Sequence, residues 1–452
     1  MATITTTNPY TQEELKTYSL ISDNDLNAKL ELGQEQFDQW KSVSIKERSK
    51  LLKQVAKLLH KRTEKYAKLM LSEMGKPITQ GIAEVEKCAW VCDFYAKNAE
   101  RFLADQLIET DAKESFISYD PLGVILAIMP WNYPFWQVMR FAAPTLMAGN
   151  TAVLKHASNV SGCALEIEQL FLDAGFPKGC FQTLLVSHEQ IETIISSSTI
   201  KAVSLTGSEP AGRKVAELAG SQLKKCVLEL GGNNACIVLN DADLDKHIKT
   251  MVQARMQNAG QSCIAAKRFI VEASIYDEFM KRFQDEVSNL ILGDPSQNET
   301  DMSAMAREDL AKEVEQQVHK SIDKGAKVVY GNSRTGAIFQ PTIVENVQPG
   351  MPLFDEEVFG PVAAIIKVEN EEEAYQMAMR SRFGLGTMVF TKDVKKARHQ
   401  IDDIGDGAFF INEMVKSDPR LPFGGTKASG YGRELSKEGI MEFVNKKTVY
   451  IK

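Results

Sequence analysis

The chain has neither an excess of positive charge nor a rich supply of cysteine. Its 452 residues hold 53 Lys and Arg against 60 Asp and Glu, and the formal charge of −7 is spread along the sequence. Neutralising the phosphates of a nucleic acid needs a basic face, so we expect no nucleic-acid partner. The 7 cysteines are scattered, odd in number and without a CxxC pair. This usage argues against a disulfide framework, a metal site or a redox dithiol, and it fits a reducing compartment.

Signals for export or membrane insertion are also missing from the sequence. The first ten residues are polar and Thr-rich, without the basic and apolar regions of a secretory signal, so we expect a cytoplasmic protein. The uncharged stretch 121–139 is long enough to cross a bilayer, but its prolines and Asn132 would be costly in lipid. We interpret it as a buried strand followed by a buried loop, and we expect no membrane association.

The remaining composition is that of a folded protein of enzyme size. With 44% hydrophobic and 25% charged residues, 29 Gly and 15 Pro, it supports neither disorder nor a collagen-like repeat. A chain of this length exceeds one ordinary core, so we expect two large domains.

Short apolar runs alternate with helical stretches from residue 123 onward, which predicts an α/β fold with parallel sheets. Strands are predicted at 124–129, 151–154, 183–186, 201–205, 235–239, 268–271, 362–368, 387–390 and 408–411. Helices are predicted at 164–174, 242–258, 275–292 and 371–380. Ahead of them, a capping box at Ser44 to Glu47 opens one amphipathic helix that runs to Gly75. We place the domain boundary near Glu229.

Three residues with catalytic potential stand in small or apolar surroundings. Cys263 follows Gly260-Gln261-Ser262, whose size would let a substrate approach the thiol, although a lone cysteine is usually an inert core residue. Glu229 ends an apolar run ahead of Gly231 and Gly232, where desolvation would raise its pKa toward that of a general base; a capping or ion-paired glutamate is the alternative. Asn132 lies in a Pro-Trp-Asn-Tyr-Pro turn after a strand, where its amide could hold an oxyanion or only satisfy the turn.

Two further features suit a nucleotide. Gly207 to Gly212 follows a strand and opens a helix, which places backbone N–H groups where a diphosphate could rest, although its GxxxxG spacing is neither a Walker loop nor a GxGxxG pattern. Lys155 ends a strand, where a lysine can bind ribose or phosphate but is more often a solvated charge.

Taken together, these motifs resemble the aldehyde dehydrogenase superfamily in order and spacing. The resemblance rests on PWNYP around Asn132, Lys155, the turn 207–212, LELGG around Glu229 and GQSC at Cys263. EVFGP at 357–361 and PFGGTKASGYGRE at 422–434 extend it over nearly the whole chain.

The resemblance implies two Rossmann-like parallel-sheet domains and a small oligomerisation arm. It assigns 1–110 and 122–229, with a return segment at about 416–436, to a nucleotide-binding domain. Residues 230–415 would form a catalytic domain bearing the nucleophile. The arm would comprise 111–121 and 437–452, with strands near 116–119 and 448–451, and would make the protein a homodimer or homotetramer.

The resemblance also implies the chemistry and the cofactor contacts. Cys263 would attack an aldehyde, Asn132 would hold the oxyanion, and Glu229 would activate water to hydrolyse the thioester. Cofactor contacts are expected from Trp131, Lys155, Ser158, Gly207, Ser208, Gly212, Gly231, Glu357 and Phe359. Many relatives that prefer NAD carry a glutamate where this chain has Ser158. We therefore expect NADP or NAD to bind, with NADP either tolerated or preferred.

Within the superfamily the chain is most similar to short succinate-semialdehyde dehydrogenases. That similarity implies that Arg140 grips a distal carboxylate, with Ser417 beside it, although an arginine that only ties down its helix is the alternative. Gln257 stands where some such enzymes have a second arginine, and Lys416 or Arg420 could supply further charge. Glutarate semialdehyde or another small aldehyde, and a CoA-acylating reaction, remain alternatives. A non-enzymatic relative would have lost the nucleophile.

Overall fold

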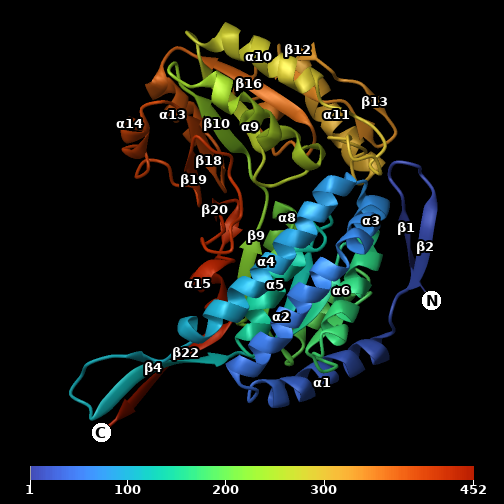
Figure 1. Ribbon diagram of the computed structural model, residues 1–452, viewed down its shortest axis with the longest axis vertical. Coiled ribbons are helices and arrows are strands. Elements are labelled where there is room, and N and C mark those ends of the chain that lie inside the picture. The colour runs from blue at the N-terminus through green and yellow to red at the C-terminus, as the bar shows by residue number, and fades with distance from the viewer. Residues whose placement is uncertain (1) are drawn as a thin grey trace.

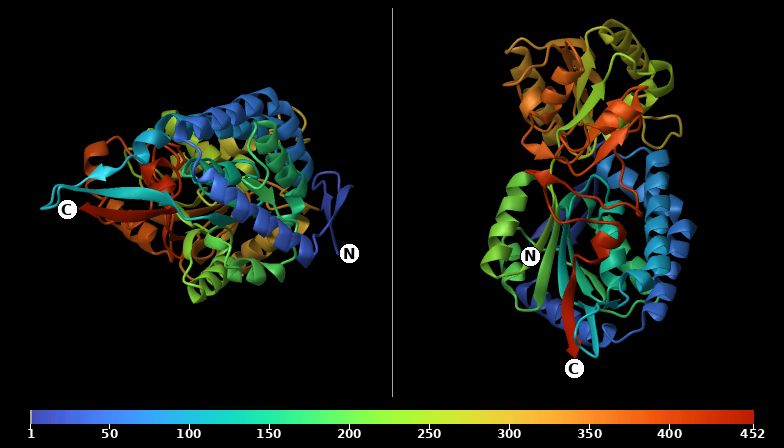
Figure 2. Two further views of the ribbon diagram at one scale, coloured as in Figure 1. Left: turned by 90° about the horizontal axis from the view of Figure 1, so that it is seen from below. Right: turned by 90° about the vertical axis from the view of Figure 1, so that its left-hand side faces the viewer.

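The computed structural model describes residues 2–452 and has two lobes, each built on its own sheet, with a strand arm projecting from one of them (Figure 1). The first lobe holds a six-stranded sheet of order β21-β9-β8-β5-β6-β7 between layers of helices (Figure 2). Its strands are β5 (Val124–Met129), β6 (Thr151–His156), β7 (Phe181–Thr183), β8 (Ile200–Thr206), β9 (Lys225–Glu229) and β21 (Gly430–Tyr431). All neighbours are parallel except β21 on β9.

Helices of the first lobe come mostly from the N-terminal part of the chain. They are α1 (Asp23–Trp40), α2 (Ile45–Lys61), α3 (Thr63–Met74), α4 (Ile78–Phe102), α5 (Trp136–Met147), η1 (Ser158–Val160), α6 (Ser161–Asp173), α7 (Gln190–Ser196), α8 (Glu209–Ser221) and α15 (Ser436–Ile440). An N-terminal hairpin of β1 (Thr3–Thr7) and β2 (Glu14–Ser19) lies beside α3 (Figure 1).

The second lobe holds a seven-stranded sheet of order β12-β15-β16-β11-β10-β18-β19. Its strands are β10 (Asn234–Val238), β11 (Ala266–Glu272), β12 (Lys327–Tyr330), β15 (Thr342–Glu345), β16 (Val362–Val368), β18 (Thr387–Phe390) and β19 (Phe409–Ile411), with only β12 antiparallel to its neighbour. Its helices are α9 (Leu244–Met256), η2 (Gln257–Gly260), α10 (Tyr276–Ser288), α11 (Glu308–Ile322), α12 (Pro352–Asp355), α13 (Glu371–Met379) and α14 (Val394–Arg398). Short pairs join β13 (Arg334–Thr335) to β14 (Ile338–Phe339), and β17 (Phe383–Gly384) to β20 (Thr426–Lys427).

The arm is a three-stranded antiparallel sheet. It consists of β3 (Gln106–Leu107), β4 (Glu114–Pro121) and β22 (Val444–Ile451), and β4 lies in the middle. The pairing runs from Val444 opposite Pro121 to Ile451 opposite Glu114, so both predicted arm strands lie side by side.

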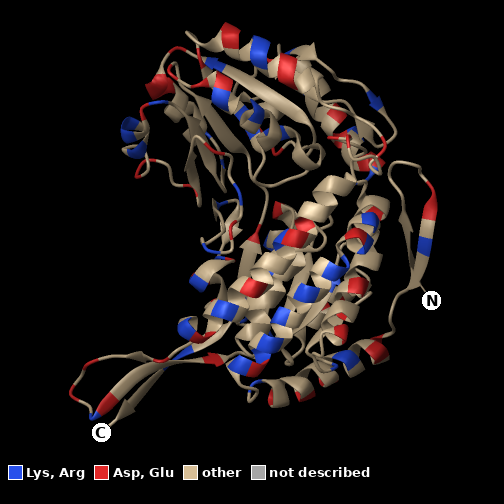
Figure 3. Ribbon diagram, in the orientation of Figure 1, with Lys and Arg blue, Asp and Glu red and all other residues tan. Residues whose placement is uncertain are grey.

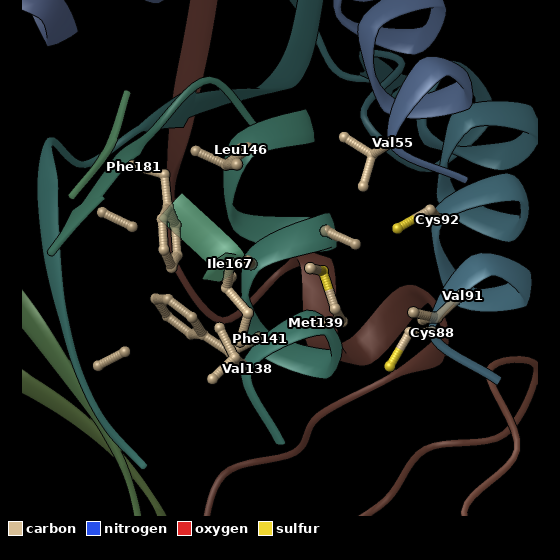
Figure 4. Close-up of a cluster of buried hydrophobic side chains, with 14 of the residues drawn as sticks. Val55, Cys88, Val91, Cys92, Val138, Met139, Phe141, Leu146, Ile167 and Phe181 are labelled. Atoms are coloured by element: carbon tan, nitrogen blue, oxygen red, sulfur yellow. The ribbon is translucent and has the colours of Figure 1, made fainter. Parts of the chain in front are cut away.

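The core of the first lobe lies between α2, α4 and α5 (Figure 4). Apolar residues of α4 recur every three or four positions, including Val85, Cys88 and Cys92, and each is fully buried. Burying such side chains stabilises the fold by ~1.5–3 kcal/mol each. Desolvation raises the pKa of the Cys88 and Cys92 thiols, which keeps both neutral and inert.

Two sequence predictions about helices were wrong. The predicted helix 44–75 is two helices, because the chain leaves helical geometry at Arg62 and the Thr63 hydroxyl donates to the Leu59 and His60 carbonyl oxygens (both 3.0 Å). The buried loop predicted to end at residue 139 becomes α5 at Trp136. The Glu84 carboxylate, on a different helix, accepts the N–H groups of Phe135 (2.9 Å) and Trp136 (3.0 Å) and so caps α5 from outside.

Charged residues of both signs are interspersed along the outer helices (Figure 3), and pairs one turn apart, such as Glu64–Lys68 and Glu308–Lys312, form ion pairs. Among residues 2–452, no helix combines the length and the apolar character needed to span a bilayer.

Candidate active site

Two cavities meet at Cys263, which lines both of them. The first cavity, of about 270 Å³, opens at the carboxyl ends of β5, β8 and β9 and is bounded by α11 of the other lobe. The second, of about 240 Å³, lies between α4, α5 and the loop 414–417. Gln137 is shared by both, so the thiol stands where two cavities of different lining adjoin.

Left-handed backbone sets the position of the nucleophile loop. Asn258 (φ 55°), Ala259 (φ 51°) and Gly260 (φ 69°) follow one another directly. A Cβ at Gly260 would collide with the Gly360 carbonyl oxygen, so only glycine fits there. The Asn258 side chain donates to the carbonyl oxygens of Asn132 (2.8 Å) and Gln261 (3.2 Å), which ties the strained loop to the first lobe.

Cys263 is half-buried, and its surroundings exert two opposing effects on the pKa of its thiol. Desolvation raises the pKa of its thiol to about 11, while the charges of Lys267 and Arg140 act in the opposite direction. Lys267 is buried and donates to the carbonyl oxygens of Ser262 and Cys263 (both 2.7 Å), which holds the loop from beneath. Within residues 2–452 the structure records no acceptor for the Cys263 N–H, which leaves it free for a ligand oxygen.

The turn that carries Asn132 is fastened by buried polar groups. The Lys76 ammonium pairs with Glu84 and donates to the Asn132 carbonyl oxygen (2.9 Å). His156 lies against the Pro134 carbonyl oxygen (2.9 Å) and so helps to hold the turn. The Asn132 amide donates one N–H to the Gln261 carbonyl oxygen (3.1 Å), and its second N–H remains for the first cavity, which the residue lines.

Glu229 is buried without a partner for either carboxylate oxygen. It ends β9, but its carboxylate lies against Gly424 and outside the lining of both cavities described above. Desolvation, reinforced by the neighbouring Glu434, raises its pKa well above the usual range, while Arg140 and Arg433 partly offset this. To act at Cys263, this carboxylate would have to turn away from Gly424.

The first cavity brings together most of the residues predicted to contact a cofactor. Its lining includes Trp131, Gly207, Ser208, Gly231, Glu357 and Phe359. The Glu357 carboxylate accepts from the Gly232 N–H and the Lys267 ammonium (both 3.0 Å). Gly212 is absent from the lining and serves packing, because a Cβ there would collide with Leu230.

Lys155 and Ser158 line a third cavity, apart from the first. Ser158 follows β6 at the start of η1 and is exposed, while burial lowers the pKa of Lys155. His188 and Glu189 also line this cavity.

Arg140 and Ser417 both line the second cavity, as does Gln257. The buried Arg140 guanidinium forms an ion pair with Glu434, donates to the Thr206 hydroxyl (3.3 Å) and lies over the Phe423 ring. Part of its role is thus structural. Lys416 also lines this cavity, while Arg420 does not; they pair with Glu413 (2.7 Å) and Asp418 (2.6 Å).

Among the polar residues of the site that sequence reasoning missed are Lys87, Gln137 and Lys267. The i, i+3, i+4, i+7 spacing of Gln80, Ala83, Glu84 and Lys87 could have shown that they share one face of a helix, but not that the face borders a cavity.

Comparison with known proteins agrees with this geometry. The profile of the aldehyde dehydrogenase family matches residues 1–449. A probable NADP(+) succinate-semialdehyde dehydrogenase of Synechocystis sp. is 50% identical over 451 residues, covering 99% of each chain. The NADP(+) succinate-semialdehyde dehydrogenase 1 of Mycobacterium tuberculosis is 46% identical over 454 residues, again covering 99% of each chain.

Among solved structures, the succinic semialdehyde dehydrogenase of Streptococcus pyogenes in complex with NADP+ superposes with a TM-score of 0.97. It is 39% identical and covers 99% of each chain. The two-lobed α/β architecture predicted from the motifs is thereby confirmed. From the matched family profile, these relatives and the common fold, it follows that the chain belongs to the aldehyde dehydrogenase family.

Proposed function

We propose that the protein oxidises succinate semialdehyde to succinate with NADP as the oxidant. The observation that carries this proposal is the meeting of two cavities at Cys263, one lined for a nucleotide and the other bearing cations and Ser417. The relatives from Synechocystis and Mycobacterium, both described as NADP(+) enzymes acting on succinate semialdehyde, support the same choice.

The first cavity fits a dinucleotide. At Gly207 an added Cβ would meet only the Leu205 side chain, at 3.8 Å, so this backbone can be approached closely. Ser208 precedes the 13-residue helix α8 without capping it, which leaves first-turn N–H groups for a diphosphate. Glu357 would bind the nicotinamide ribose, and Lys155 with Ser158 would hold the adenosine end, where the absence of a glutamate at residue 158 accommodates a 2′-phosphate. When bound, NADP supplies the acceptor for the two electrons removed from the aldehyde.

Cys263 supplies the nucleophile in this proposal. Its thiol loses a proton to solvent and the sulfur bonds to the aldehyde carbon, while the Cys263 N–H and the Asn132 amide donate to the oxygen that becomes negative. Oxidation leaves a thioester on Cys263. Glu229 then takes a proton from the attacking water, which breaks the C–S bond and releases the acid.

Arg140 and Ser417 are proposed to receive the distal carboxylate of the substrate in the second cavity. Arg140→Leu would also deprive buried Glu434 of its partner, so some loss on every aldehyde is expected in addition to a selective loss on succinate semialdehyde. Equal losses on charged and uncharged aldehydes would make Arg140 purely structural.

We also propose that the two lobes and the arm have different functions. The nucleotide would bind to 1–110 and 122–229 with the return segment 416–436, while 230–415 carries the nucleophile and 111–121 with 437–452 mediates assembly. Exposed apolar residues on the arm, such as Leu107 and Ile451, would be covered in a homodimer or homotetramer, which light scattering would measure. The 7 free cysteines suit a cytoplasmic location.

The test is reduction of NADP by the purified protein with succinate semialdehyde, glutarate semialdehyde and methyl 4-oxobutanoate, an uncharged ester of the first. We expect the highest kcat/KM for succinate semialdehyde and a free carboxylic acid as product. Glutarate semialdehyde adds a methylene, which changes discrimination by only ~1–3 kcal/mol. Equal rates on acid and ester would refute the proposed substrate, and formation of a CoA thioester in place of the acid would refute hydrolysis.

A further inference from the structure

We propose that Lys87 acts beside Arg140 in selecting for the substrate's distal carboxylate, a role that rests on the function proposed above. Lys87 lies on α4 and lines the second cavity together with Cys263, Arg140 and Ser417. Its ammonium donates to the Ser417 hydroxyl (2.8 Å) and lies over the Trp136 ring, with 4.3 Å between the nitrogen and the ring centre. These contacts place the charge at the cavity without neutralising it.

Ion pairing distinguishes Lys87 from the other cations of the cavity. Arg140 is paired with Glu434, and Lys416 is paired with Glu413. Across residues 2–452, no carboxylate lies within ion-pair distance of the Lys87 ammonium. The excess positive charge of the cavity is therefore that of Lys87.

The nearby carboxylates are already engaged elsewhere. Glu84 lines the same cavity one turn before Lys87, but it pairs with Lys76 and accepts two backbone N–H groups. Asp418 is held by Arg420. Lys87 is half-buried, and a partly desolvated cation without an anion is costly, so a substrate carboxylate would lower that cost.

Gln257 lines the same cavity and carries no charge, so it can offer a carboxylate only neutral hydrogen bonds. An ammonium held by Ser417 offers further N–H donors to a carboxylate, since lysine has three. Ser417 is then a positioning residue for Lys87 as well as part of the cavity wall.

The test compares Lys87→Met with wild type on succinate semialdehyde and on methyl 4-oxobutanoate, using NADP and the full-length protein. We expect kcat/KM for succinate semialdehyde to fall about 10- to 100-fold, mainly through KM, and that for the ester to change less than about threefold. Lys87→Arg, which keeps the charge, should restore most of the loss. Lys97→Met makes the same chemical change on the exposed face of α4 and should leave both values unchanged.

The possible results distinguish failure of the Lys87 proposal from failure of the proposed function. A wild-type protein that oxidises acid and ester equally well refutes the carboxylate substrate and this role with it. A clear wild-type preference for the acid that persists in Lys87→Met overturns the role of Lys87 alone. Equal losses on both compounds, or no rescue by arginine, would also overturn it and show a structural lysine.

If Lys87→Met does not fold, the pH dependence of KM in the wild-type protein tests the role of Lys87. Burial and the charge of Arg140 lower the pKa of Lys87 to about 8, against the opposing effects of Cys88, Glu84 and Asp418. Lys87 thus loses its charge above that pH. KM for succinate semialdehyde should rise between pH 8 and 9 while KM for the ester stays constant, whereas parallel or flat profiles would overturn the role.

Discussion

Removing the ammonium of Lys76 should destabilise the protein and impair catalysis together. Its nitrogen pairs with Glu84, donates to the Asn132 carbonyl oxygen (2.9 Å) and lies 4.0 Å from the centre of the Tyr133 ring, all within the protein interior. Lys76→Met would leave the Glu84 carboxylate with backbone N–H partners alone. Breaking a buried ion pair from one side costs ~3–5 kcal/mol. We expect a loss of this size in the free energy of unfolding.

A double-mutant cycle measures the coupling between Lys76 and Glu84. Glu84→Gln alone should cost a similar amount, because it leaves Lys76 as an unpaired buried cation. The double variant has no charge left at this buried pair, and the glutamine oxygen can still accept the N–H groups that begin α5. Its loss should therefore be smaller than the sum of the single losses by ~1–3 kcal/mol.

Urea denaturation, with m-values compared among the variants, measures these differences. The kcat of Lys76→Met should fall on charged and uncharged aldehydes alike, because the Asn132 turn loses its anchor. Single losses below about 1 kcal/mol, or losses that add in the double variant, would refute the view that this pair holds the turn.

Further predictions concern the thiol, the buried histidine, the nucleophile loop and cofactor choice. Because burial raises the pKa of Cys263 to about 11, its alkylation by iodoacetamide should accelerate about tenfold per pH unit from pH 8 to 10, and a plateau below pH 9 would contradict this. Burial lowers the pKa of His156 from 6.5 to about 4, so the stability that depends on its neutral form is fully present above pH 6.5. About 3 kcal/mol of the free energy of unfolding should be lost as the pH falls to 4, and His156→Gln should flatten that pH dependence in urea titrations. Gly260→Ala should abolish activity and lower Tm, whereas Gly220→Ala, where an added Cβ meets nothing, should be neutral or stabilising; equal effects would remove the conformational argument. Ser158→Glu should lower the ratio of kcat/KM for NADP over NAD at least about tenfold, and an unchanged ratio would separate this residue from cofactor choice.

The local sequence pattern predicts the bounds of an element correctly where the element's own residues determine its ends. The strands 124–129, 362–368 and 387–390 have the predicted bounds, because each is an apolar run closed by turn residues. The long helix α4 went unpredicted although its buried positions recur every three or four residues, since its polar residues face a cavity as well as solvent. The start of α5 could not be predicted, because its cap comes from Glu84 on another helix.

Some residues of the candidate site could be predicted from short motifs, and others are recognised only in the folded chain. Cys263, Asn132 and Glu357 lie in short motifs, and the structure brings all three to the first cavity. The pairing of Arg140 with Glu434 joins residues far apart in the sequence, and only the folded chain shows that it compensates the arginine's charge. Lys87 is likewise one ordinary helical lysine until packing of α4 against α5 places it in the second cavity.

The central claim is that Cys263 carries the acyl group between oxidation and hydrolysis. Glu229→Gln should slow hydrolysis, so brief incubation of this variant with succinate semialdehyde and NADP, followed by acid quench and peptide mass spectrometry, tests it directly. We predict a succinyl group on the peptide containing Cys263, no such group in Cys263→Ala, and no turnover by that second variant. An acyl group on another residue, or substantial turnover by Cys263→Ala, would contradict the account.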